Sequence, residues 1–264
     1  MSSRVARTAI ALLTVLTAPS TWAEDKPICP VRPGRGTSAC TLDQGRAQIE
    51  LGLFDDSFQH RSGVTTDTDN AGSLLLKWGV SDRMDVEAGM ALYQEQRVHD
   101  TTGTTTMGGI GDLFLHTKFN PLTSDGPLAL ALDPFVKLPT AGGGLGNGAV
   151  EGGLVLPMSY DLGHNWSLAM PPEADVQHNM AGGGYHANLV NVVGLGKSFG
   201  PWTLGAEVWS SQNLDPAGSV SQYSFDLDAA WLANNDTQID GGVNIGLNRA
   251  TPDLEIYVGI SRRF

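Results

Sequence analysis

Two short stretches of the sequence carry residue types that bind phosphate groups or calcium ions in other proteins. Gly196–Ser198 reads Gly-Lys-Ser, the tail of a phosphate-binding loop, but Asn191 stands where that loop requires its first glycine. Asp67–Gly72 begins like a calcium-binding loop, but Ala71 replaces one ligand and Trp78 occupies the position of the bidentate glutamate. Neither motif is complete. We therefore expect the first stretch to be a strand and the second a solvated acidic loop.

The histidines show no spacing typical of a metal site. His60, His99, His178 and His186 fall in or near segments that we expect to be loops, and His116 lies within an alternating run. No set of residues has the spacing of a nucleophile with its general base. We therefore expect no metal, no cofactor and no catalytic residue.

The only cysteines, Cys29 and Cys40, lie close together near the N-terminus. In an oxidising compartment two neighbouring thiols form a disulfide. Closing so short a loop restricts the unfolded chain by roughly 3 kcal/mol at best. Since no metal-ligating partner lies nearby in the sequence, a structural disulfide is the favoured interpretation.

The N-terminal region has the features of a secretory signal peptide. Arg4 and Arg7 supply the positive charge, and an apolar stretch with a small-residue cleavage site follows. The expected organisation is a signal peptide at 1–23, an N-terminal segment with the disulfide at 24–45, and a single domain at 46–264.

Composition excludes two classes of protein. The formal net charge is −12 and the basic residues are scattered, which argues against nucleic acid as a partner, because its phosphates require a basic surface. The 264 residues also contain no run of about 18 apolar residues, the length that a transmembrane helix needs.

From residue 46 onward, apolar residues recur at every second position, a period typical of strands and not of helices. Tyr223 and Phe225, for example, alternate with Ser224 and Asp226. An even number of such runs is typical of bacterial membrane barrels. We count twelve runs, at about 46–54, 73–80, 83–94, 109–119, 128–138, 151–160, 166–176, 188–199, 202–210, 221–232, 237–248 and 253–264.

The connections between the runs alternate between long polar segments and short turns. The segments expected to be long loops include 55–72 and 96–106. Membrane barrels have short periplasmic turns and longer external loops, so with a periplasmic N-terminus this order places the long loops outside the cell. Within the runs, Pro171 and Pro172 predict a break, because proline in a strand belongs at an end, an edge or a bulge.

The second face of these runs carries too much charge for a dry core, because burying each unpaired ion costs several kcal/mol. A wet lumen removes that cost, and the strands must close because an open edge in lipid leaves backbone groups unpaired. We therefore predict an all-β fold, a closed antiparallel transmembrane β-barrel of about 12 strands. The candidate lumen-lining residues are Glu50, Lys77, Asp85, Glu87, Asp112, His116, Lys118, Lys137, Glu207, Asp226, Asp228, Asp240 and Glu255.

These charges have two open interpretations. Lys118 or Lys137 could pair with Asp112 or Glu207 across a narrow barrel and hold the interior together. Alternatively, the charges could set ion preference, as rings of charge do in pores.

The last run ends on Phe264, and in this the chain resembles outer-membrane barrels, whose terminal aromatic residue is a signal to the assembly machinery. Arg262 departs from that pattern, although at the rim its guanidinium could reach lipid headgroups. The expected partners are outer-membrane lipid, the barrel assembly machinery and a small-molecule solute, with no nucleic acid.

Several longer stretches resemble the family of predicted outer-membrane barrels named for the meta-pathway of phenol degradation. They are Gly108–Asn120, Pro134–Gly148 and Thr237–Phe264, and the resemblance is carried by the Gly111–Asp112 pair, Lys118, Lys137–Thr140 and the C-terminal hairpin. These motifs belong to the fold and name no substrate. The family is thought to include transporters associated with the catabolism of aromatic compounds, so the resemblance implies a pore for small hydrophobic or aromatic molecules.

We therefore expect a channel of the bacterial outer membrane that passes small solutes passively, and no enzyme. One alternative is a non-conducting barrel that serves as a surface scaffold or binding platform. Another is an outer-membrane phospholipase, which would need a lipid-facing Ser and His on neighbouring strands, and the sequence shows no local signature for them. Whether the N-terminal segment folds into the barrel as a plug stays open.

Overall fold

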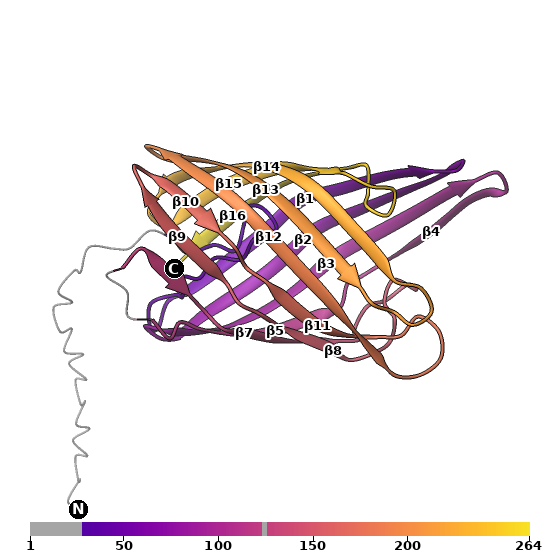
Figure 1. Ribbon diagram of the computed structural model, residues 1–264, viewed down its shortest axis with the longest axis horizontal. Helices are drawn as coiled ribbons and strands as arrows, with labels where there is room; N and C mark the ends of the chain where they lie inside the picture. Colours follow the sequence, from indigo (N-terminus) through magenta and orange to yellow (C-terminus); the bar gives the residue numbers. More distant parts are fainter. Residues whose placement is uncertain (1–27, 123–125) are drawn as a thin grey trace, which may run out of the picture.

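The computed structural model describes residues 28–122 and 126–264 (Figure 1). The predicted signal peptide at 1–23 lies outside the described residues. Within the described ranges the chain forms β-strands, turns and loops. No helix in this part of the chain is long and apolar enough to cross a membrane.

The strand segments follow one another along the chain with short turns or polar loops between them. They are β1 (Ala47–Arg61), β2 (Val64–Ser81), β3 (Met84–Asp100), β4 (Gly103–Gly109), β5 (Leu113–Phe119), β6 (Leu128–Leu130), β7 (Asp133–Leu138), β8 (Glu151–Val155), β9 (Met158–Gly163), β10 (Trp166–Ala169), β11 (Glu173–His178), β12 (Tyr185–Phe199), β13 (Trp202–Asn213), β14 (Val220–Asn234), β15 (Thr237–Gly246) and β16 (Leu254–Arg263).

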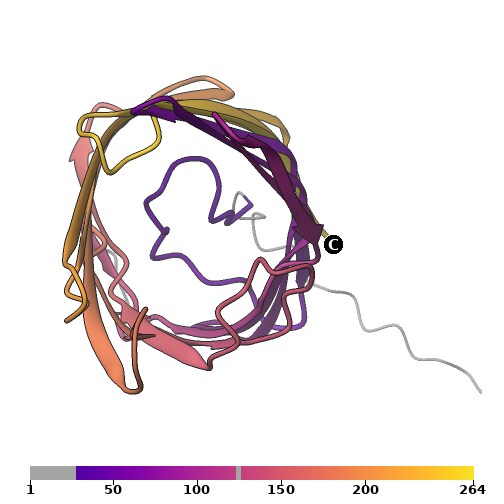
Figure 2. The same ribbon diagram turned by 90° about the vertical axis from the view of Figure 1, so that its right-hand side faces the viewer.

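These segments build a closed antiparallel barrel of 12 strands, which confirms the predicted fold class. β4 with β5, β6 with β7, β8 with β9, and β10 with β11 are each two parts of one interrupted strand. The sheet closes because β1 pairs with both β2 and β16, and β12 pairs with β13 on one side and with β10 and β11 on the other. An end view shows the continuous wall around the lumen (Figure 2).

Three neighbouring strands are interrupted side by side. The amide of Ala131 donates to the carbonyl of Pro157 at 2.9 Å, and the amide of Leu156 donates to the carbonyl of Pro172 at 2.9 Å. Proline has no N–H to give to the ladder, so the strand pairing stops at these positions. The break predicted at Pro171 and Pro172 is confirmed, since β10 ends before them and β11 begins after them.

The expectation of long loops at 55–72 and 96–106 is wrong, because both segments form β-hairpins. β1 and β2 meet at a two-residue turn in which Ser62 and Gly63 have φ values of 52° and 84°, as tight hairpins require. The acidic stretch Asp67–Gly72 is therefore part of β2 and no solvated loop. Both faces of these hairpins are largely polar, so no alternation of hydrophobicity marks them in the sequence. They extend past the rest of the barrel (Figure 1).

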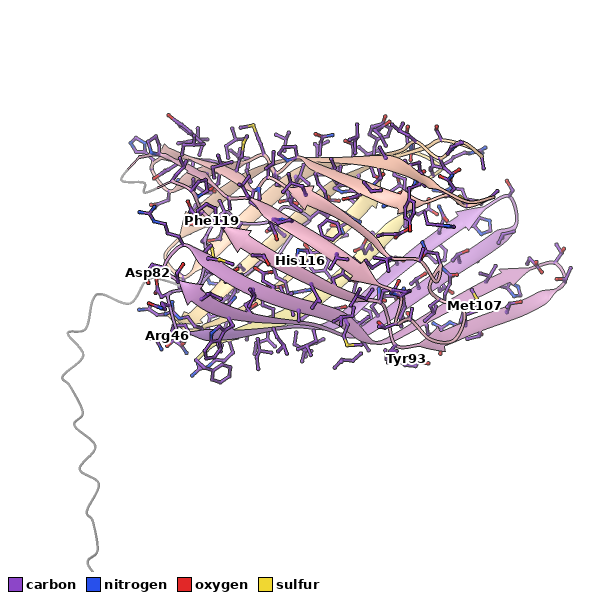
Figure 3. The ribbon with its side chains drawn as sticks, turned by 90° about the horizontal axis from the view of Figure 1, so that it is seen from below. Arg46, Asp82, Tyr93, Met107, His116 and Phe119 are labelled. Carbon is purple, nitrogen blue, oxygen red and sulfur yellow. A yellow bond between two sulfur atoms is a disulfide. The ribbon has the colours of Figure 1, made fainter. Side chains whose placement is uncertain are left out.

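The large apolar side chains face outward and the charged side chains face inward, the reverse of a soluble core. Trp78, Val208 and Ile256 expose 52%, 51% and 45% of their surface, whereas Lys118 and Asp226 expose none. The outward side chains fringe the wall in Figure 3. A continuous apolar belt of this kind is stable against lipid and unfavourable in water, so the outer face of the barrel faces the membrane.

Candidate functional site in the barrel lumen

The N-terminal segment folds into the lumen. Residues 28–45, which we call the plug, form the loop that lies inside the wall in Figure 2. The predicted disulfide between Cys29 and Cys40 is confirmed, with the two Cα atoms 5.9 Å apart. The plug enters near the end of the barrel that carries the C-terminus, because Ile28 donates its amide to the carbonyl of Asn235 at 2.9 Å. We call this end the terminal end and the opposite one the far end.

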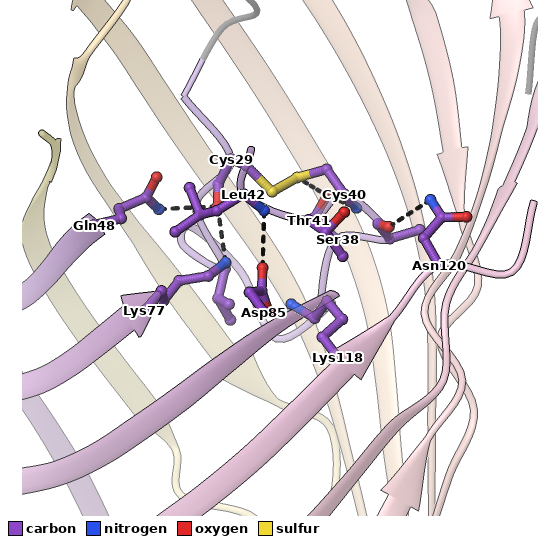
Figure 4. Close-up of a disulfide and its surroundings, with 12 residues drawn as sticks. Cys29, Ser38, Cys40, Thr41, Leu42, Gln48, Lys77, Asp85, Lys118 and Asn120 are labelled. Atoms are coloured by element: carbon purple, nitrogen blue, oxygen red, sulfur yellow. Dashed lines mark hydrogen bonds between the residues drawn. A yellow bond between two sulfur atoms is a disulfide. The ribbon is translucent and has the colours of Figure 1, made fainter. Parts of the chain in front are cut away.

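The base of the plug, which carries the disulfide, is fixed to β1, β2 and β3 (Figure 4). Gln48 and Lys77 both donate to the carbonyl of Cys29, at 2.9 and 3.0 Å, and the amide of Leu42 donates to Asp85 at 2.9 Å. Leu42 is buried. A Cβ atom on Gly79 would lie 2.1 Å from the carbonyl oxygen of the neighbouring plug residue Asp43, so only glycine lets the plug approach here.

Arg32 anchors the middle of the plug to β1 and to the neighbouring strands β15 and β16. Its Nε lies 3.0 Å from Asp240 on β15, and its backbone amide donates to Glu50 on β1 at 3.2 Å. The guanidinium lies above two glycines: a Cβ on Gly259 would be 2.4 Å from Nε, and one on Gly52 would be 3.1 Å from Nη1. The wall therefore has a socket shaped for this side chain.

Arg35 reaches a cluster of carboxylates farther into the barrel. Its amide donates to Glu207 at 2.8 Å, and its guanidinium lies 2.5 Å from Glu255 and 3.6 Å from Asp226. The guanidinium also lies 4.6 Å from the ring centroid of Trp209, within the range of a cation–π interaction. The plug thus places cations where the lumen is most acidic, which compensates charges that would otherwise repel one another.

A second charge network lies within the wall itself, on the side away from the two arginines. Lys118 lies 3.1 Å from Glu87, which is also 3.4 Å from Lys77. Lys137 lies 3.2 Å from Asp112 and 2.8 Å from Glu151. Of the ion pairs that the sequence left open, the one between Lys137 and Asp112 forms. Lys118 instead pairs with Glu87, and Glu207 accepts a hydrogen bond from the plug.

The structure places the thirteen candidate residues around the lumen, twelve of them on strands and Asp112 between β4 and β5, and they form two groups. Seven contact the plug directly: Glu50, Lys77, Asp85, Glu207, Asp226, Asp240 and Glu255. The remaining six are Glu87, Asp112, His116, Lys118, Lys137 and Asp228. The expectation of a hydrated acidic lining needs correction, because several of these side chains are covered by the plug or by their ion-pair partners and have almost no exposed surface.

Sequence reasoning missed the residues of the plug that face this lining. Arg32 and Arg35 stand in a short Pro- and Gly-containing loop between the two cysteines, and that position was their only signal. Asp133, which lies 3.2 Å from His116, was also missed, because Pro134 follows it and obscures the alternating pattern.

The plug does not fill the lumen. Between it and the wall formed by β1, β2, β3 and β5 lies a cavity of about 380 Å³. Arg32 and Thr37 of the plug line one side, and Leu75, Met90 and Phe114 line the other. Among the residues described, no group of three or more metal-ligating side chains is close enough to hold an ion. The lumen therefore offers a path or a binding site for a small molecule beside the plug.

Known proteins share this fold. The structure superposes on an outer membrane channel from Pseudomonas putida F1 with a TM-score of 0.67 and 15% identity, over 89% of this chain and 100% of that one. The NanC porin gives a TM-score of 0.51 and 9% identity, over 81% of this chain and 98% of that one. The β domain of the Bordetella autotransporter BrkA gives a TM-score of 0.53 and 13% identity, over 84% of this chain and 100% of that one. No curated protein matches the sequence.

The fold of these barrels and the outward apolar belt place the protein in the bacterial outer membrane. The sequence resemblance is confirmed at the level of the family. A family model described as "Putative MetA-pathway of phenol degradation" matches residues 31–264, which includes most of the plug and the whole barrel. The chain belongs to this family.

Proposed function

We propose that the protein is a channel through which small solutes, in particular hydrophobic or aromatic ones, cross the outer membrane passively. The observation that carries this proposal is the cavity beside the plug, inside a closed barrel whose outer face suits lipid. The similar barrel from Pseudomonas putida F1 is described as an outer membrane channel, and a second similar barrel as a porin, which supports the same function here.

The contacts of the plug suggest how a solute would pass. The two arginines hold the plug against β13 to β16, which leaves the opposite wall of the lumen accessible. The base of the plug crosses the terminal end, where its contacts with Gln48, Lys77 and Asp85 stand in the way of a molecule that leaves the cavity. Passage in this scheme requires the base of the plug to shift, with no chemical step and no nucleotide.

Planar bilayers test the channel directly. Full-length protein is reconstituted, and ionic current is recorded in the presence of neutral salt. We expect discrete, small conductance steps, because the plug narrows the lumen. A membrane that contains folded protein and shows no conductance above the lipid background would reject the channel and favour the alternative, a non-conducting surface scaffold.

We further propose that Phe264 serves as the recognition signal for the barrel assembly machinery. Its side chain is 58% exposed, and the Arg262 guanidinium lies 5.8 Å from its ring centroid. Phe264→Ala is expected to lower the yield of folded barrel in cells while leaving refolding in detergent unchanged. Equal yields in cells would contradict this role.

A further inference from the structure

A row of polar side chains crosses four neighbouring strands on the lumen side of the wall. Glu207 on β13 lies opposite Asp226 on β14. Asn244 on β15 lies opposite both Asp226 and Glu255, the latter on β16. Side chains directly opposite one another on a sheet share a face and have Cβ atoms about 4.5–5.5 Å apart. The register therefore joins these four residues, which we call the acidic row, into one continuous strip.

A cation from the plug already lies on the acidic row. The Arg35 guanidinium is 2.5 Å from Glu255 and 3.6 Å from Asp226. It is also 4.6 Å from the ring centroid of Trp209, which lies two residues beyond Glu207 on the same face of β13. Carboxylates and an aromatic face together recognise a guanidinium, because its planar fork pairs with carboxylates and its flat surface stacks on rings. The lumen thus contains a guanidinium site whose present ligand is part of the chain.

Arg35 leaves part of this site unsatisfied. Oδ1 of Asp226 and Oδ1 of Asn244 have no hydrogen-bond partner within the described part of the chain, although the two residues expose only 0% and 3% of their surface. Nε of Arg35 stays 3.6 Å from Asp226, which is too long for a hydrogen bond. A buried acceptor without a partner costs about 1–3 kcal/mol. A free guanidinium, which no backbone holds in place, can move closer and donate to these oxygens.

The same wall carries more negative charge than the plug compensates. Arg32 and Arg35 supply two positive charges, and both are engaged by carboxylates. Asp228 forms no ion pair within the described residues, and the charged groups that act on it are three further carboxylates on β13, β14 and β15. A cationic ligand is therefore attracted to this part of the lumen, whereas an anion is repelled.

The site is open to the lumen. The side chains of Arg35 and Glu255 are 25% and 18% exposed, so water and small solutes reach the ion pair. β13 runs from Trp202 near the terminal end toward the far end, which places Trp209 on the far-end side of Glu207. The plug loop is visible through the far end of the barrel in Figure 2. A ligand that enters from the far end therefore meets the Trp209 side of the site.

We propose that the acidic row and Trp209 form a binding site for small molecules that bear a guanidinium group, and that such a ligand competes with Arg35. The ligand lies over the Trp209 ring and donates to Asp226 and Glu255, while its remaining N–H groups supply the acceptor of Asn244. Because Arg35 is displaced, binding also weakens the contact that holds the plug. The site goes beyond the proposed channel function, since binding is defined without any current.

Binding is tested by isothermal titration calorimetry on full-length protein in lipid nanodiscs, with agmatine as the probe and empty nanodiscs as the blank. Agmatine carries a guanidinium and an amine, whereas putrescine carries the same total charge on two amines. We expect saturable binding of agmatine and an affinity at least about fivefold lower for putrescine, which lacks the planar fork. Equal affinities would overturn the guanidinium class, and no saturable binding of agmatine would overturn the site.

Competition with the plug makes a prediction that a general attraction of cations does not share. Arg35→Met vacates the site, so agmatine should bind at least about tenfold more tightly, because the fraction of protein with a free site rises. Arg61→Met, which removes the partner of Asp253, is the control and should bind like the unaltered protein. Adding Glu255→Gln to Arg35→Met should abolish the gain.

All variants are first shown to fold by the heat-dependent gel shift of barrels. If Arg35→Met binds agmatine no more tightly than the unaltered protein, or if the added Glu255→Gln leaves the gain intact, the site is not the acidic row.

Hydrogen exchange in the unaltered protein reports the displacement without any substitution. The Arg35 amide, which donates to Glu207 at 2.8 Å, should exchange faster as agmatine saturates the site, and unchanged exchange at saturation would reject the competition. These outcomes are separate from the channel function. Agmatine binding without conductance in bilayers would reject the channel and keep the site, and conductance without agmatine binding would keep the channel and reject the site.

Discussion

Replacement of Arg35 by methionine is the sharpest test of the docked plug. The change keeps most of the side-chain length and removes the charge that lies 2.5 Å from Glu255 and 3.6 Å from Asp226. Removing one partner of a buried ion pair costs about 3–5 kcal/mol. Because the Arg35 side chain is 25% exposed and water can enter the lumen, we expect about 2–3 kcal/mol. The equilibrium between docked and released plug should then shift by about 30- to 150-fold toward release.

Single-channel recording and hydrogen exchange report this shift independently. We expect more frequent or larger openings in bilayers and faster exchange of the Arg35-position amide, which donates to Glu207 in the docked plug. Cation preference should also rise, because Glu255 and Asp226 lose their counter-charge. The matched control is Arg61→Met, since Arg61 pairs with Asp253 at the far end, where the plug makes no contact with either residue, and has a similar exposure of 27%. Unchanged conductance together with unchanged exchange in the Arg35 variant would refute the role of the plug.

Three further predictions concern the same device and its surroundings. Gly259→Val should displace the Arg32 guanidinium, since even a Cβ would lie 2.4 Å from its Nε, and we expect the conductance to increase. Conductance equal to that of the unaltered protein would argue against the socket for Arg32. Reduction of the disulfide should raise solute flux, because it loosens the base of the plug. The Cys29→Ser variant should show high flux with or without reductant. If neither change alters the flux, the disulfide has no role in opening the channel. The hydrogen bond from the Met180 amide lowers the pKa of Asp215, which lies in a far-end loop. This hydrogen bond is therefore fully present above the ordinary aspartate pKa of about 3.9 and is lost only as pH falls through the lowered pKa. Hydrogen exchange of the Met180 amide, corrected for intrinsic rates, should thus stay slow from pH 7 to about 4 and rise below that range; a rise near pH 6 would contradict the assignment.

The strands that cross the membrane could be predicted because lipid imposes a strict pattern on them. β14 and β16 alternate apolar and polar residues over their whole length, since one face meets hydrocarbon and the other the lumen. The hairpin of β1 and β2 beyond the apolar belt has water on both sides, so its strands carry Thr and Asp on both faces. The two-residue period of these strands therefore produces no alternation of apolar and polar residues, and the sequence does not predict the hairpin.

The inward charges could also be read from the alternation, but their partners could not. Arg35 and Glu255 are separated by 220 positions, and no local sequence pattern predicts that a loop near the N-terminus contacts the last strand. The glycines that receive the plug, such as Gly259 and Gly52, resemble the many other glycines of the chain until the position of Arg32 is known. From the sequence, hydration by water in the lumen is the simplest explanation for the inward carboxylates. In the structure the arginines of the plug compensate several of them.

Solute entry into proteoliposomes tests the central claim most directly. Vesicles that contain full-length protein are diluted into an isosmotic solution of a small neutral aromatic alcohol, and swelling is followed by light scattering. The account predicts faster swelling than in vesicles without protein, and a further increase with the Arg35→Met variant, whose plug is released more often. Identical swelling with and without folded protein would contradict it.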